Sequence, residues 1–228
     1  MMTNLFSSFD PSTNSMMSIN WMSTVIGMMI MPYMYWMLPS RMMLMWTNTS
    51  NKLHNELNNI INQKDKSMTL MFISMFIMLL VNNFMGLFPY IFTSTSHMVM
   101  TFSLAMPLWL TYMFFGWIKK TKNMFAHLVP MSTPPILMPF MVMIETISNM
   151  IRPGTLAVRL SANMIAGHLL MTLMGNTGTN LSMMMLYIML MMQMLLIILE
   201  SAVAVIQAYV YTVLSTLYFS EIYVNKKL

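Results

Sequence analysis

The chain contains no cysteine and few charged residues, and each of these features excludes certain classes of protein or site. Without cysteine, disulfide bonds and thiolate metal sites are excluded. Only 7% of the 228 residues are charged, whereas a soluble domain has about 25%, and 57% are hydrophobic. So few charges cannot coat a soluble surface of this size. The composition therefore predicts an all-α integral membrane protein, with residues 1–228 forming one membrane domain of several spans.

Several kinds of functional site are also missing. The net charge is +5, but no basic stripe with interleaved aromatic residues lies outside the apolar runs, so we expect no nucleic-acid partner. Of four histidines only His168 lies deep in a predicted span, which argues against a bis-histidine haem. There is no phosphate-binding loop, nucleophile motif or metal-ligand cluster. We therefore expect no cofactor, no metal and no ATP hydrolysis by this chain alone.

The apolar runs predict about five membrane helices, because a span needs about 20 mostly apolar residues. The runs lie at approximately 17–38 (interrupted by Pro32), 68–88, 98–118, 135–174 and 181–222. In the polar segment 47–67, apolar residues recur at helical spacing, at Leu53, Leu57, Ile60 and Ile61. This segment is either an amphipathic helix on the surface of the basic side or an ordinary loop, and the pattern favours neither.

Positive charges gather on one side of this predicted topology. With five spans, nine of the 11 Lys and Arg residues share a side: Arg41, Lys52, Lys64, Lys66, Lys119, Lys120, Lys122, Lys226 and Lys227. The other side, with the N-terminus and the segments 89–97 and 175–180, has no Lys or Arg. The positive-inside rule then puts the C-terminus in the compartment of synthesis and the N-terminus opposite.

The last two apolar runs are too long for simple upright spans. From residue 181 onward there is no glycine or proline, and the run before it has only the sequence RPG (152–154) to bend it. A 40-residue helix is about 60 Å long, whereas the hydrocarbon core is about 30 Å thick. We therefore predict two long, steeply tilted helices packed as a hairpin through 175–180.

Five ionisable residues lie in these two runs: Glu145, Arg152, Arg159, His168 and Glu200. Each costs roughly 2.5–3.5 kcal/mol in a membrane, so each is a functional candidate. The first three are seven residues apart and share a helical face, which Asn163 extends. Glu200 and Gln207 are also seven apart on the last run. His168, nine residues past Arg159, points to nearly the opposite side.

The aligned charges also allow a purely structural interpretation. Glu145 or Glu200 could neutralise an arginine, and the cluster would then only hold two helices together. Arg152 fits this alternative best, because it is nearest the basic side and its head group could reach the interface. Two rival functions are a secondary transporter and a structural subunit of a respiratory complex. No internal repeat supports the first, and the aligned Arg and Glu residues argue against the second.

Two long motifs resemble a known family. The segments ETISNMIRPGTLAVRLSANMIAGHLLM (145–171) and LESAVAVIQAYVYTVLSTLYF (199–219) closely resemble subunit a, or subunit 6, of mitochondrial F-type ATP synthases. NFMGLFP (83–89) and AMPLW (105–109) resemble it too, so the resemblance covers essentially the whole chain. The 38 methionines resemble an invertebrate mitochondrial product.

The resemblance implies a role for each matched residue. Arg159 matches the family's essential arginine, which faces the ring of c-subunits. Glu145 matches the acidic residue of the matrix-side half-channel, and His168 and Glu200 match the pair that lines the half-channel from the intermembrane space. Asn163 and Gln207 match polar neighbours. Arg152 is matched less securely, because the family varies there.

The resemblance also implies the setting in which the chain works. By this resemblance the chain is a proton-conducting stator subunit of the Fo motor. Such a subunit has no active site of its own but is essential to an H⁺-transporting ATP synthase. The implied partners are the c-ring, the peripheral-stalk subunit b, subunit 8, membrane lipids and the transported proton. The implied location is the mitochondrial inner membrane, with the N-terminus in the intermembrane space and the C-terminus in the matrix.

Overall fold

The computed structural model describes residues 5–13, 17–32, 35–61, 66–129, 134–178 and 182–223. The helices of these residues are, in order, η1 (Leu5–Phe9), η2 (Ile19–Met22), α1 (Ser23–Met29), α2 (Arg41–Ile61), α3 (Lys66–Gly86), η3 (Ser94–Ser96), α4 (Met98–Lys119), α5 (Thr121–Leu128), α6 (Met138–Thr177) and α7 (Met183–Tyr223). Among the described residues, four helices are long and apolar enough to cross a membrane, namely α3, α4, α6 and α7. The expected all-α membrane class is confirmed.

The first apolar run differs from the expectation of one helix over 17–38. Its described residues form only η2 and α1, which together end at Met29 and are too short for a span. Pro32 explains the early end, because it disfavours helical backbone in the residue before it. At the start of α1, the Ser23 hydroxyl donates to the distant backbone carbonyl of Phe92 and so ties α1 to that segment.

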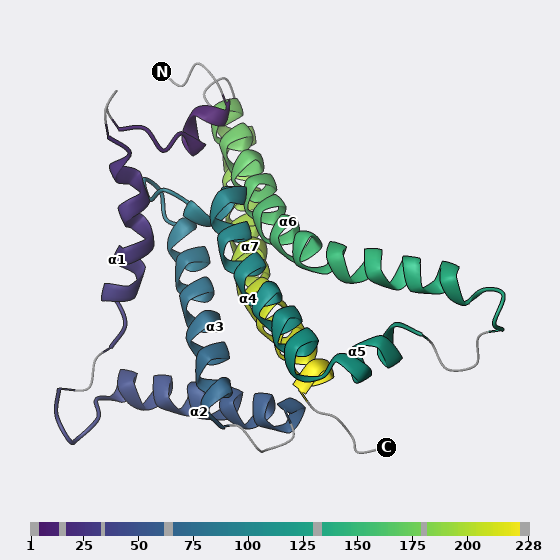
Figure 1. Cartoon of the computed structure of the whole chain (residues 1–228). Coiled ribbons are helices and arrows are strands. Elements are labelled where there is room, and N and C mark those ends of the chain that lie inside the picture. The colour runs from purple at the N-terminus through teal and green to yellow at the C-terminus, as the bar shows by residue number, and fades with distance from the viewer. Residues whose placement is uncertain are drawn as a thin grey trace.

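Helix α2 settles the alternatives for the segment 47–67 in favour of a helix over 47–61, while 62–65 lie outside the described residues. Figure 1 shows α2 crossing the lower end of α3 rather than running parallel to it. Its apolar stripe is turned inward, and Leu57 and Ile61 are each 3% exposed. On α3 the hydroxyl of the buried Thr69 lies 3.0 Å from His54 Nδ1 of α2, which ties the two helices together.

The two longest helices meet only over part of their length. Figure 1 shows the second half of α6 running beside α7, whereas its first half projects away from the bundle. The hairpin that the sequence predicts is therefore present in the second half of α6 alone. Pro153 lies inside α6, where it removes one backbone hydrogen bond and permits a bend. The tilt of this pair relative to a membrane stays a prediction.

The core lies where α3, α4, α6 and α7 meet. Three of its members are alanines with almost no exposure, namely Ala105, Ala157 and Ala208. Small side chains let membrane helices approach closely, so van der Waals contact holds the helices together where no hydrophobic driving force exists. Larger residues such as Leu79 and Leu160 fill the remaining space. This packing fixes which face of α6 is turned outward.

The two ends of the bundle differ in the elements that they gather. Figure 1 shows α2, α5 and the end of α7 at one end, and η1 with the end of α6 at the other. The exposed basic residues Arg41, Lys52, Lys119 and Lys122 lie on α2, on α5 and at the end of α4. We call this the basic end and the other the N-terminal end. Lys64, Lys226 and Lys227 lie outside the described residues.

Candidate functional site

The second half of α6 has two faces of opposite character. One packs into the bundle, with Leu156, Ala157, Leu160, Ser161 and Met164 buried. Arg159 and Asn163 lie on the other face and are exposed, with the exposed Ala162 and Ala166 beside them. Among the described residues, the Arg152 side chain forms two ion pairs, whereas the Arg159 side chain forms none. The arginine guanidinium is thus presented outward between small side chains.

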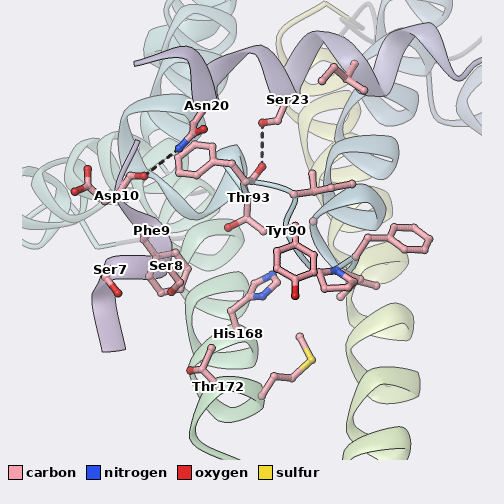
Figure 2. Close-up of a pocket in the computed structure, with 18 of the residues that line it drawn as sticks. Ser7, Ser8, Phe9, Asp10, Asn20, Ser23, Tyr90, Thr93, His168 and Thr172 are labelled. Carbon is pink, nitrogen blue, oxygen red and sulfur yellow. Dashed lines mark hydrogen bonds between the residues drawn. The ribbon is translucent and has the colours of Figure 1, made fainter. Parts of the chain in front are cut away.

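His168 lies in a different environment from Arg159, as the nine-residue spacing predicts. It lines a cavity of about 1050 Å³ at the N-terminal end, which is formed by η1, η2, α1, the segment 86–93, α6 and α7. Figure 2 shows His168 and Thr172 projecting from α6 into this space. The ring of Phe9 meets the imidazole edge-on, with 6.3 Å between ring centroids.

The segment before η2 is held over this cavity by polar contacts. His97 Nε2 lies 2.8 Å from the backbone carbonyl of Phe9, so it donates a hydrogen bond to that oxygen. The Asn20 amide donates to the carbonyl of Asp10 at 3.4 Å, as Figure 2 shows. The Asp10 carboxylate accepts the backbone N–H of Ser12 at 3.0 Å and its hydroxyl at 2.8 Å. These two bonds hold the pKa of Asp10 below its usual value.

Glu200 of α7 reaches α6 immediately beside His168. A Cβ atom added to Gly167 would overlap Oε1 of Glu200 and lie 2.5 Å from its carboxyl carbon. The absence of a side chain at Gly167 therefore makes room for this carboxyl group. Both of its oxygens and Nε2 of His168 are buried, with no hydrogen-bond partner among the described residues. The sequence analysis did not single out Gly167, although small residues in membrane helices mark places where helices approach closely.

Arg152 forms a separate charged cluster at the basic end. Its Nη2 lies 3.7 Å from Glu145 Oε1, and its Nη1 donates to Glu221 Oε2 at 3.4 Å. The guanidinium also lies over the ring of Tyr218, 5.2 Å from its centroid. The ion pair with Glu145 that the structural alternative requires is therefore made by Arg152 and not by Arg159. The contact also agrees with the seven-residue spacing that puts both residues on one face.

The remaining polar candidates are not brought into one site. Asn163 is exposed and Gln207 is half-buried, and neither lines the cavity beside His168. Glu221 was missed from the sequence, although it continues the seven-residue series of Glu200 and Gln207 along α7. No group of three or more His, Cys, Asp or Glu that could hold a metal occurs among the described residues.

Comparison with known proteins identifies the family. Residues 15–220 match the family model described as ATP synthase A chain. ATP synthase subunit a of Locusta migratoria is 60% identical over 225 residues, which cover 98% of this chain and 100% of the relative. The proteins of the same name from Aedes aegypti and Drosophila melanogaster are 59% and 60% identical, over 97% of this chain and 100% of each relative. The chain belongs to the ATP synthase A chain family.

Membership of the ATP synthase A chain family confirms the resemblance of the sequence motifs. The chain is a proton-conducting subunit of the Fo part of ATP synthase, and it works within that complex together with other subunits. It is a multi-pass mitochondrial membrane protein. The secondary-transporter and respiratory-complex hypotheses are therefore wrong. The roles of individual residues depend on the geometry described above.

Proposed function

We propose that the chain conducts protons through two half-channels that start from opposite ends of the bundle and are separated by Arg159. The observation that carries this proposal is the opposite facing of two side chains on α6. Arg159 lies on its exposed face, whereas His168 lines the cavity at the N-terminal end. Protons that enter past His168 would then have to leave the chain before they could pass the arginine.

The proposed entry half-channel begins at this cavity. It reaches from the N-terminal end to His168, and the carboxyl group of Glu200 lies next to it across Gly167. Both groups can accept and release a proton, and both are buried without a hydrogen-bond partner among the described residues. A proton would pass from the cavity to this pair and then toward the exposed face of α6, where Asn163 and Gln207 supply polar surroundings.

The proposed release half-channel lies at the basic end. Glu145 is its acidic residue, on the first half of α6, with 28% of its side chain exposed. It lies two helical turns before Arg152 and four before Arg159. The two half-channels therefore approach the exposed face of α6 from opposite ends of the bundle, with Arg159 between them.

Arg159 would act on a carboxylate of the partner that covers this face, the ring of c-subunits. A cation about 4 Å from a carboxylate is worth about 4 kcal/mol at an effective dielectric of 20. Such a cation favours release of the proton from that carboxylate. Because arginine is effectively always protonated, it cannot relay protons and so blocks a direct leak. A membrane potential of 100 mV supplies about 2.3 kcal/mol per proton, which the ring converts into rotation.

The proposed setting follows from the two ends of the bundle. The basic end faces the matrix, where the chain is made, and the N-terminus faces the intermembrane space of the mitochondrial inner membrane. The exposed apolar surfaces of α6 and α7 contact the c-ring, subunit b, subunit 8 and lipid. Alanines beside Arg159 on α6 would let the ring approach closely.

The test replaces Arg159 by alanine or lysine in the intact complex, reconstituted in vesicles. Loss of about 4 kcal/mol corresponds to a fall of about a thousandfold in a rate, so ATP-driven pumping should become undetectable. In Arg159→Ala, passive proton leak should also rise. Arg159→Lys should lose coupled transport and still insert, because a compact ammonium loses its proton more readily when buried.

Arg41→Ala is the matched control, because Arg41 is exposed at the start of α2 and remote from the proposed path. Proton pumping is followed by a fluorescent pH indicator, ATP hydrolysis is measured in parallel, and insertion is checked by immunoblot. Unchanged pumping in Arg159→Ala would mean that the arginine is no barrier and that the proposal is wrong.

A further inference from the structure

Arg152 lies where the two halves of α6 meet, at the point where the first half leaves the bundle. It directly precedes Pro153, which lies inside α6. Its guanidinium reaches back to Glu145 on the first half of α6 and across to Glu221 at the end of α7. Tyr218 of α7 lies under the same guanidinium and lines a small cavity together with Pro153. One side chain therefore joins the segment before the bend to the end of another helix.

The segment before the bend has few other means of support. We call residues 138–151 the arm of α6. Its large apolar side chains are exposed, with Phe140, Met143 and Met150 between 62% and 73% accessible. Figure 1 shows the arm leaving the bundle, with α5 below it. A side chain that links the base of the arm to α7 can therefore decide the direction in which the arm points.

We propose that Arg152 is a positioning residue, which fixes the direction of the arm and thereby the location of the Glu145 carboxylate. The proposal rests on the proposed function of Glu145 in the release half-channel. The planar guanidinium suits this task, because it can donate to two carboxylates at once while its face stacks on an aromatic ring. A lysine ammonium carries the same charge but lacks the forked geometry.

The expected effect is modest and measurable. The side chains of Arg152, Glu145 and Glu221 are 29%, 28% and 46% exposed, so solvent screens both ion pairs. A screened pair favours the paired arrangement by a factor of about 1.4 to 5. Loss of Arg152 removes both pairs and the ring contact, whereas loss of the Glu221 charge removes only the link to α7. Both changes should let the arm move.

The experiment measures the arm directly, in the intact complex in vesicles. Cysteines replace Met143 on the arm and Leu217 on α7, which are 62% and 40% exposed, and they are spin-labelled. Because the chain has no cysteine of its own, it contributes no other label. Pulsed electron paramagnetic resonance then gives the distance distribution between the labels. ATP synthesis driven by a proton gradient is measured on the same unlabelled variants.

We expect Glu221→Gln to increase the population at other label distances by a factor of about 1.4 to 5, Arg152→Gln to increase it further, and both to lower ATP synthesis. Arg152→Lys should give values between those of Arg152→Gln and the unaltered chain. Arg41→Gln and Glu56→Gln are matched controls, because both residues are exposed on α2. They make the same chemical changes away from the arm and should alter neither measurement.

The outcomes separate this inference from the proposed function. An unchanged distance distribution in Arg152→Gln, or in Glu221→Gln, overturns the positioning role, whatever happens to ATP synthesis. A changed distribution with undiminished ATP synthesis supports the positioning role and instead contradicts the role of Glu145 in proton release. If Arg152→Lys gives the same distance distribution and the same ATP synthesis as Arg152→Gln, the charge is not what holds the arm.

Discussion

Replacing Gly167 with alanine tests how closely Glu200 must lie against α6. The new Cβ atom would overlap Oε1 of Glu200 and lie 2.5 Å from its carboxyl carbon, whereas ordinary contact begins at 3.4 Å. The carboxyl carbon must therefore retreat by at least about 0.9 Å and Oε1 by more, which is possible because they are the far end of a flexible side chain. Gly167→Ala should thus leave the helices packed and displace one carboxyl group.

The displacement has an expected size. A side chain forced off its preferred rotamer costs about 0.5–1.5 kcal/mol. If proton entry needs the carboxyl group of Glu200 in its original place, the rate of ATP synthesis should fall by a factor of about 2 to 13. The assay is ATP synthesis at a fixed proton gradient in vesicles that hold the intact complex. Gly175→Ala is the matched control, because nothing lies within 4 Å of a Cβ atom added there on the same helix.

A second substitution shows whether the displaced carboxyl group is responsible. Glu200→Asp withdraws the group by about one carbon–carbon bond, roughly 1.5 Å, which relieves most of the overlap. In a double-mutant cycle, Gly167→Ala should therefore cost less in the Glu200→Asp background than in the unaltered chain. ATP synthesis that is unaffected by Gly167→Ala, or equal losses in the two backgrounds, would refute the reasoning.

Two further predictions concern contacts outside the proposed path. Thr69→Val removes the hydroxyl that bonds to His54 and should lower the free energy of unfolding by about 0.5–1.5 kcal/mol. Thermal denaturation in detergent measures this change. An unchanged midpoint would mean that this bond does not stabilise α2. The pKa of Asp10 is lower in the folded chain than in the unfolded chain, so its charged form stabilises the turn at Ser12. This stabilisation is fully present above the unfolded pKa of about 3.9 and is lost as the pH falls through the lower, folded pKa. Asp10→Asn should therefore speed hydrogen–deuterium exchange of residues 5–13 at neutral pH, and the difference should shrink under acid; equal exchange at neutral pH would contradict this account.

Hydropathy alone locates the long helices but not the short ones. α3 and α4 match their predicted runs to within a few residues, because a membrane-spanning segment must be both apolar and helical. The run 17–38 also looks apolar enough for one helix, yet α1 ends at Met29, shortly before Pro32. The bend of α6 was foreseeable from Pro153. The separation of its first half from α7 depends on tertiary contacts that no local pattern encodes.

The candidate site, too, is only partly predictable from the sequence. Helical periodicity gives the opposite facing of Arg159 and His168, because both lie on one continuous helix. The cavity beside His168 could not be predicted, since its walls come from segments far apart in the sequence. The bond between His97 and Phe9, for example, joins residues 88 positions apart. Ion-pair partners are equally hidden, because helical spacing cannot show that Glu221 of α7 reaches the guanidinium of Arg152 on α6.

The inward-facing apolar stripe of α2 has a consequence for the time that the chain needs to complete its packing. Leu57 and Ile61 pack with Phe72 and with Phe219, which lies about 150 residues later and near the end of the chain. At 5–20 residues per second, a ribosome would need roughly 7–30 s to reach Phe219 after Phe72. During that time the early helices have only lipid, or a chaperone, to cover their apolar faces. Packing of this cluster therefore finishes only when α7 has been made, and a chain that ends before Phe219 would lack one of its members.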